Sequence, residues 1–487
     1  IVKPSIHFSP FKITERLIYY EKKVRDILKD KNLIDKDYVE ETFVFQLINI
    51  LSSIECINLS IINEKTKYWT LINKNKIIKI NNKNEILSII IKNIIENQIG
   101  QFKIKKDSKQ KFRWILKLIN FLIFKYAKRN KIWFTGNNYG FPNIAKNIYE
   151  NDKDCSIFYL FSDKKFIIIK SIISLFKIFI RKKEIIGIEP VVDENRVYRN
   201  KIDIILEQTL DNELLKIKKL ISKYLSEICD YTDNIYNYLD EIVFKTKPKL
   251  LIAHHLYFME AITLGSIFNK YNKSCYILSH GSHRNSDNEF CNYELKRHAN
   301  GLLYSKFASH IFVQNLGGDK LLKSISDKNK SLLNNKKIIN TKPIMWGKKI
   351  NDRKVKKNKE FIFLHASTFK PLSARNLIYE NSFEYFDNII NLSKAFDKLS
   401  NTKLIILAKN LTECSHLTLK ENIKNFKNVI IKSSGTGDRQ SFIDYLKNAD
   451  CLISYSSTTI EEAIYNNIPV GIINFSGNNY INFCPKK

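Results

Sequence analysis

Hydrophobic and polar positions follow two periods along most of this chain, and together they predict a mixed α/β protein. Short apolar runs bounded by polar or glycine-containing turns predict buried strands. Between them, apolar residues recur every three or four positions, as on one face of a helix. The expected strands are Ile132–Thr135, Ser156–Phe161, Leu250–Ala253, Cys275–Ser279, Ile311–Gln314, Phe361–Leu364, Leu404–Leu407, Val429–Ile431, Cys451–Ser454 and Val470–Ile473. Alternating strands and helices are typical of doubly wound parallel sheets.

The strand pattern divides the chain into four parts. Residues 1–130 mix apolar helical stretches with polar turns and predict a helix-rich N-terminal extension. Residues 131–340 and 359–487 each hold one alternating series, so each predicts a Rossmann-like domain. Residues 341–358 predict a basic linker, because seven of the twelve residues from Lys348 to Lys359 are Lys or Arg, against one Asp.

Length and charge narrow the class of protein. With 487 residues, 44% of them hydrophobic, the chain is long enough for two or three folded domains. Its formal net charge is +31, yet only twelve of the 80 Lys and Arg residues are arginine. Arginine is the residue that reads bases and phosphates through bidentate contacts. We therefore expect anionic small molecules or an anionic membrane as partners, and no nucleic acid.

The cysteines and the hydropathy pattern predict a cytoplasmic protein. No C-x-x-C pair occurs among the eight scattered cysteines, Cys56, Cys155, Cys229, Cys275, Cys291, Cys414, Cys451 and Cys484. Such usage indicates reduced thiols and argues against disulfides or a zinc site. No apolar run reaches the roughly 20 residues that span a bilayer. We expect neither a metal ion nor a cofactor.

One segment predicts peripheral contact with the inner face of a membrane. Lys164–Lys183 holds seven Lys or Arg residues, no acidic residue, and many Ile, Leu and Phe residues. In a helix, one face would carry Lys170, Ser174, Lys177 and Arg181. A basic amphipathic helix of this kind can lie in the interface of an anionic bilayer. The alternative is a helix that packs on the sheet by its apolar face.

Four consecutive hydroxyl residues follow the expected strand Cys451–Ser454 and lead into a helix expected over Ile460–Tyr465. They are Ser456, Ser457, Thr458 and Thr459. Hydroxyl groups and free N–H groups at a helix N-terminus form an anion site that suits a phosphate or pyrophosphate. Glu462, one turn inside the helix, is placed to reach a ribose hydroxyl. The alternative is an ordinary βαβ unit with a Ser or Thr N-cap.

Five of the nine histidines stand just beyond an expected strand, where ligands bind in open α/β sheets. These are His254, His255, His280, His283 and His365. His280 is the sharpest candidate, because Gly281 permits close approach of the backbone to a ligand. An imidazole that titrates near neutrality can also take a proton from an acceptor hydroxyl. The alternative is a histidine that caps the end of its strand.

Several of these motifs resemble those of known enzymes. The stretch Asp450–Ile472 resembles the nucleotide-sugar half of GT-B fold glycosyltransferases, with their "S-T/S…E-A…G-x-P-V" pattern. Ser279–Ser282 resembles the "H-G" motif of bacterial surface-polymer transferases, including capsule Kdo transferases and CDP-glycerol glycerophosphotransferases. Leu364–Thr368 resembles the first loop of a GT-B donor domain. The chain opens on Ile1 rather than Met, and it stops soon after the last expected strand, where GT-B domains usually add one or two helices, so we expect a chain truncated at both ends.

The resemblance implies two Rossmann-like domains that face a cleft, and a glycosyltransferase that moves a sugar from a nucleotide-sugar donor to a growing cell-surface polysaccharide or lipid-linked glycan. Ser367, Thr368, Lys409 and the hydroxyl turn Ser456–Thr459 would contact the donor phosphates, and Glu462 the ribose. His280 would be the base or a phosphate partner, with His254 and His255 as alternative candidates for the base.

The absence of a D-x-D motif in a strand context favours a metal-independent mechanism. Two alternative functions remain at this stage. One is a CDP-glycerol-type glycerophosphotransferase, and the other is a non-enzymatic basic protein that binds nucleic acid or a membrane.

Overall fold

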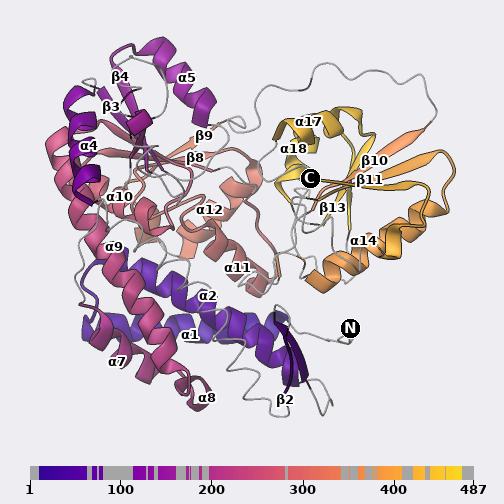
Figure 1. Cartoon of the computed structure of the whole chain (residues 1–487), viewed down its shortest axis with the longest axis horizontal. Helices are drawn as coiled ribbons and strands as arrows, with labels where there is room; N and C mark the ends of the chain where they lie inside the picture. The colour runs from indigo at the N-terminus through magenta and orange to yellow at the C-terminus, as the bar shows by residue number, and fades with distance from the viewer. Residues whose placement is uncertain are drawn as a thin grey trace.

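The molecule contains two parallel sheets and a group of N-terminal helices (Figure 1). The computed structural model describes residues 10–62, 69–73, 76–80, 113–127, 130–135, 141–160, 172–174, 176, 186–188, 197–279, 283–328, 330–341, 350, 360–367, 377–378, 380, 382–408, 421–433, 439–455 and 457–473. This architecture confirms the predicted α/β class with two Rossmann-like domains and N-terminal helices.

The first sheet has seven parallel strands in the order β5-β4-β3-β6-β7-β8-β9. Their bounds are β3 Asn130–Thr135, β4 Cys155–Leu160, β5 Ile186–Ile188, β6 Leu250–Ala253, β7 Ser274–Leu278, β8 His310–Val313 and β9 Lys337–Asn340. The strand order runs outward from β3 in one direction and from β6 in the other. The topological switch point therefore lies between these two strands, and ligands bind at the carboxyl ends beside such a point.

Helices cover both faces of the first sheet, which is why its central strands are almost continuously apolar. On one face, α5 (Phe141–Asn151) packs Phe141 and Tyr149 near Phe134. On the other face, Trp133, Leu251 and neighbouring strand residues pack against α4 (Arg113–Tyr126), α9 (Lys218–Thr246), α10 (Met259–Lys270) and α12 (Leu316–Lys328). Helices α11 (Glu289–Ala299) and α13 (Lys330–Leu333) also belong to this domain.

The second sheet has five parallel strands in the order β12-β11-β10-β13-β14. The strands are β10 Phe361–His365, β11 Thr402–Ala408, β12 Val429–Ser433, β13 Cys451–Ser454 and β14 Val470–Ile472, with helices α14 Ser382–Asp397, α17 Arg439–Asn448 and α18 Thr458–Tyr465. Leu364 and Leu452 pack against Ile460 of α18 and Leu446 of α17. The switch point lies between β10 and β13, directly beside the start of α18.

The N-terminal helices pack on the first domain through a shared hydrophobic core. Helix α1 (Pro10–Lys31) buries a residue every three or four positions, the spacing of one helical face, at Ile13, Leu17, Tyr20, Val24 and Leu28. It packs with α2 (Asp37–Ile62), α7 (Arg199–Thr209) and the first half of α9, while α8 (Asn212–Leu215) follows α7. The second half of α9 packs on the first sheet. One helix thus spans both layers (Figure 1).

Three elements were not expected from the sequence. The N-terminal extension contains an antiparallel hairpin, β1 (Trp69–Asn73) with β2 (Lys76–Ile80). Strand β5 is only three residues long. Strand β9 is a mostly exposed edge strand in a lysine-rich stretch, and its two apolar residues, Ile338 and Ile339, form too short a run to indicate a strand.

The predicted linker, residues 341–358, falls almost wholly outside the described residues. The same holds for Lys164–Lys183, of which residues 172–174 and 176 are described. Within that short part Ile172, Ile173 and Phe176 are exposed and Ser174 is buried. Membrane contact by this segment stays a prediction. None of the helices in the described residues combines the length and hydropathy of a bilayer-spanning segment.

Candidate functional site

The loops that follow β7 and β8 in the first domain meet the start of α18 in the second. Arg284 donates from Nη2 to the Ser457 carbonyl oxygen at 3.3 Å, and its Nε lies 3.3 Å from Glu461 Oε1. Asn315, just past β8, donates from Nδ2 to Glu461 Oε2 at 2.7 Å. The loop that carries the "H-G" motif and the hydroxyl turn are therefore in contact across the domain boundary.

This contact is an ion pair largely removed from water. The side chain of Arg284 is 6% exposed and that of Glu461 is 16% exposed. Removing one partner of such a pair would leave the other charge buried without compensation, which is strongly unfavourable. The pair therefore constrains how the two domains meet.

The two loops of the first domain also approach each other closely, and Gly317 permits it. A Cβ atom at Gly317 would lie 2.6 Å from the His283 carbonyl oxygen, inside the contact distance. On the other side of the same turn, Gly318 N–H donates to Asn315 Oδ1 at 2.6 Å. Asn315 therefore binds the first turn of α12 with one side-chain atom and Glu461 with the other.

The hydroxyl turn is partly occupied by local hydrogen bonds. Ser457 is the N-cap of α18, and its Oγ accepts from the Thr459 N–H at 3.3 Å. Thr459 Oγ1 donates to the Ala366 carbonyl oxygen at 3.1 Å. The Thr458 side chain is exposed. The N-cap interpretation is thus correct for Ser457, and Thr458 is the hydroxyl most open to a ligand among the three described ones.

The two glutamates of α18 have different environments. Glu462, for which we predicted a ribose contact, is buried, whereas Glu461 is directed across the domain junction toward Arg284. The role of Glu462 stays a prediction.

Ser367, predicted to contact donor phosphates, is buried and bonded to a carboxyl group. Its Oγ donates to Glu380 Oε2 at 2.9 Å, and Asn388 Nδ2 donates to Glu380 Oε1 at 2.6 Å. Burial raises the pKa of Glu380 to about 7, although these two hydrogen bonds act in the opposite direction. Glu380 is thus a titratable group directly behind the carboxyl end of β10.

The histidines past the strands are enclosed by neighbouring side chains. His254 and His255 are both buried. The His255 ring lies 4.7 Å from that of Tyr257 and 4.6 Å from that of Phe258. His365 ends β10 rather than following it, because the strand is one residue longer than expected; it is fully buried, and burial lowers its pKa to about 4.

Four predicted site residues fall outside the described residues, namely His280, Thr368, Lys409 and Ser456. Among the residues that are described, no three His, Cys, Asp or Glu side chains are grouped so that they could hold a metal ion.

Sequence reasoning missed Arg284, Asn315, Glu461 and Glu380. One signal was available for Arg284, since it is one of only twelve arginines and stands three residues after Gly281 of the "H-G" motif. The other three depend on contacts between distant segments.

A second buried carboxylate joins all three parts of the molecule. Glu294 on α11 accepts from Thr14 Oγ1 of α1 at 2.7 Å and from the Leu377 N–H at 2.8 Å. Around it, Cys291 and Leu295 form an apolar cluster with Leu377 and Ile378. The domain junction therefore contains two contacts. One is the ion pair of Arg284, and the other is the apolar cluster around the Glu294 carboxylate.

No protein-family model matches the chain, and no curated protein matches it. Among solved structures it is similar to UDP-GlcNAc 2-epimerase from Neisseria meningitidis bound to UDP-GlcNAc, with 12% identity over 71% of this chain and 83% of that chain and a TM-score of 0.42. It is also similar to the lipopolysaccharide outer core galactosyltransferase WaaB in its apo form (14% identity, 71% of this chain and 82% of that one, TM-score 0.37). A third similar structure is that of the wall teichoic acid polymerase TagF, with 10% identity over 78% of this chain and 80% of that chain and a TM-score of 0.35. Likenesses this distant assign no activity, and the two parallel sheets themselves define the GT-B-like arrangement.

The Arg284–Glu461 pair should stabilise the fold, and the effects of replacing its two members should not be additive. Arg284→Met and Glu461→Gln should each lower the free energy of unfolding by about 3 kcal/mol, because each leaves the remaining charge without its counter-charge in a site largely removed from water. The double variant should lose less than the sum, with a coupling of about 1 kcal/mol or more. Urea unfolding of the four proteins measures both quantities.

The exposed pair Lys245–Glu241 serves as a matched control. Its removal should change stability by less than about 1 kcal/mol. Strictly additive losses for Arg284 and Glu461 would contradict the pairing.

Glu380 is expected to make stability depend on pH. Its folded-state pKa of about 7 lies above the ordinary value of 4.5, so the folded state binds the extra proton between these values. The contribution of Glu380 to stability should therefore be fully present below about pH 4.5 and be lost as pH rises toward 7, by roughly 3 kcal/mol in total. Glu380→Gln cannot titrate and should flatten this part of the stability–pH curve.

Denaturant unfolding of the wild type and of Glu380→Gln from about pH 4 to about pH 8 would test this prediction. This range covers both pKa values. Glu421→Gln, at an exposed helical position, should leave the curve unchanged. Parallel curves for the wild type and Glu380→Gln would show that Glu380 is ionised in the fold.

Proposed function

We propose that the chain is a GT-B-type glycosyltransferase that moves a sugar from a nucleotide-sugar donor to a cell-surface polysaccharide or lipid-linked glycan. The observation that carries the proposal is the contact of the Arg284 loop with the Ser457–Glu461 turn. Open α/β sheets bind ligands at the carboxyl ends of their strands. Here the loops at the carboxyl ends of β7 and β8 lie against the start of α18, which stands beside the switch point of the second sheet.

The donor diphosphate would bind at the start of α18. The unpaired N–H groups of a helix N-terminus and its positive dipole end favour an anion there. Arg284 adds a guanidinium within hydrogen-bond distance of the Ser457 backbone. Such a fixed cation next to the leaving nucleotide would stabilise the charge that develops as the bond to the anomeric carbon breaks. Thr458 and Ser456 would supply further donors.

The acceptor hydroxyl must lose a proton as it attacks the anomeric carbon. His280 is our candidate base, because it precedes the His283–Arg284 stretch that reaches the hydroxyl turn. His254 and His255 remain candidates at the neighbouring strand end, where both are packed among aromatic rings.

The first test separates donor binding at α18 from simple helix capping. Asp and Asn cap a helix about as well as Ser, so Ser457→Asp and Ser457→Asn should both keep the fold. Only the aspartate places a negative charge beside the donor phosphates. Thermal shifts with UDP, GDP, CMP, CDP and dTDP should show one stabilising nucleotide for the wild type and for Ser457→Asn.

The same nucleotide should give no shift with Ser457→Asp. Equal shifts for the two variants would place the donor elsewhere. If CDP alone stabilises the protein, activity with CDP-glycerol compared with CMP-sugars and CDP-sugars separates the glycerophosphotransferase from the glycosyltransferase. If no nucleotide stabilises the wild type, the proposed function is wrong.

The second test concerns the base. His280→Asn should keep the nucleotide-induced thermal shift and lower turnover by a factor on the order of 10²–10⁴, as expected for loss of proton transfer. His254→Asn and His255→Asn are the matched comparisons. An inactive His254 or His255 variant beside an active His280 variant would move the base to the end of β6. A lower melting temperature with normal turnover would make His280 a capping residue.

A further inference from the structure

Helix α4 exposes a row of large apolar side chains on one face. Trp114, Leu118 and Phe121 are 69%, 50% and 61% exposed. Their spacing of four and three residues places them on one side of a helix. Lys117 and Lys125 are exposed on the same side. We call these five residues the α4 face.

The opposite side of α4 is held in place by the first domain. Ile119 and Ile123 belong to the core that contains Trp133 of the sheet. Asn120 is buried and donates from Nδ2 to the Tyr238 hydroxyl of α9 at 2.7 Å. The helix therefore cannot turn its apolar residues inward without losing these contacts. Their exposure is a fixed property of the fold.

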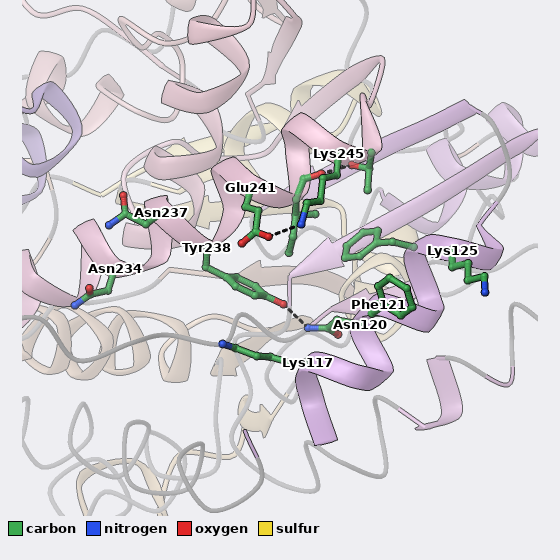
Figure 2. A pocket seen from close by; sticks show the side chains of 12 residues that line it. Lys117, Asn120, Phe121, Lys125, Asn234, Asn237, Tyr238, Glu241 and Lys245 are labelled. Carbon is green, nitrogen blue, oxygen red and sulfur yellow. Dashed lines mark hydrogen bonds and ion pairs between the residues drawn. The ribbon is translucent and has the colours of Figure 1, made fainter. Parts of the chain in front are cut away.

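A pocket of about 630 Å³ lies beside the α4 face, between α4 and α9 (Figure 2). Lys117, Phe121 and Lys125 belong both to the pocket and to the face. The α9 wall is mostly polar, with Asn234, Asn237, Tyr238, Glu241 and Lys245. Glu241 and Lys245 pair with each other, so two lysine charges remain in excess along the lining.

Charge along the sequence around α4 is of one sign. Residues 102–131 contain eleven Lys or Arg residues and a single acidic residue, Asp107. Large apolar residues beside lysines, with the helix lying along the surface, match an interfacial membrane helix. We propose that the α4 face docks this protein on an anionic bilayer, with the apolar side chains below the headgroups and headgroup phosphates at Lys117 and Lys125.

The size of the face favours a bilayer over a second protein. Three side chains at these exposures present on the order of 400 Å² of surface. A stable protein–protein interface buries about 800 Å² on each partner, roughly twice that area. A bilayer sets no such minimum, because neighbouring lysines add attraction to anionic lipid. Exposed aromatic and lysine side chains together also suit the headgroup region.

The α4 face lies on the side of the first domain away from the second domain (Figure 1). Docking there leaves the Arg284 junction uncovered. The proposal does not depend on the glycosyltransferase function, and it concerns a different element from Lys164–Lys183.

Sedimentation of the full chain with vesicles tests the proposal. The wild type should pellet with phosphatidylcholine vesicles that contain phosphatidylglycerol, and less with phosphatidylcholine alone or in added salt. The variant Trp114→Ser with Phe121→Ser should lower the partition coefficient about tenfold or more. Lys117→Glu with Lys125→Glu should abolish the preference for phosphatidylglycerol. Circular dichroism and melting temperature verify that each variant is folded.

The control is Phe361→Ser with Leu399→Ser, two exposed apolar residues in the second domain, and it should pellet like the wild type. The proposal is wrong if the Trp114/Phe121 variant also pellets like the wild type, or if the wild type ignores vesicles. It is equally wrong if Lys170→Glu with Lys177→Glu abolishes binding while the α4 variants keep it. A dimer that the Trp114/Phe121 variant dissociates would make the face a contact between copies. Salt-sensitive RNA binding in place of vesicle binding would also overturn it.

Discussion

A buried charge needs a partner, and in this molecule that requirement operates across the domain boundary. Arg284 comes from the loop after β7 and Glu461 from the first turn of α18. A shift of either element that kept the site closed to water would leave one charge without its partner, which is strongly unfavourable. Because α18 begins at the switch point of its sheet, the pair holds that switch point against the first domain. The geometry of the candidate site follows from this single contact.

The N-terminal helices belong to the same framework. Glu294 receives hydrogen bonds from Thr14 of the N-terminal layer and from the Leu377 backbone, so one carboxylate on α11 contacts all three parts of the chain. Helix α9 adds a second connection, because one half packs on α1 and α2 and the other half on the sheet. The residues before the first Rossmann-like domain therefore help to position α11, whose preceding loop carries Arg284.

The sequence predicted the fold well where the signal is local. Expected strands such as Leu250–Ala253 and Cys451–Ser454 have the observed bounds, because buried parallel strands are apolar along their whole length. The exposed edge strand β9 has only two apolar residues between Lys337 and Asn340, and it was missed. The hydroxyl turn was recognised for the same local reason. By contrast, Arg284 and Ser457 lie 173 residues apart in the chain, and no periodicity of the sequence predicts their contact. Glu380 was missed for the same reason, because its pKa is raised by burial in the folded protein, which the local sequence does not show.

The ion pairs of the described residues differ in their exposure to water, and therefore in their sensitivity to salt. Several arginines link separate elements: Arg25 of α1 lies near Glu40 and Glu41 of α2, Arg297 of α11 donates to Asn49 of α2, and Arg284 joins the domains. The planar guanidinium group of arginine presents several N–H donors, so one arginine can bind two partners at once. Many lysine pairs instead join residues three or four apart on one exposed helix, such as Lys245 with Glu241. Salt screens exposed charges far more than buried ones. Raised ionic strength should therefore weaken the attraction of exposed lysines for anions before it loosens the Arg284–Glu461 pair between the domains.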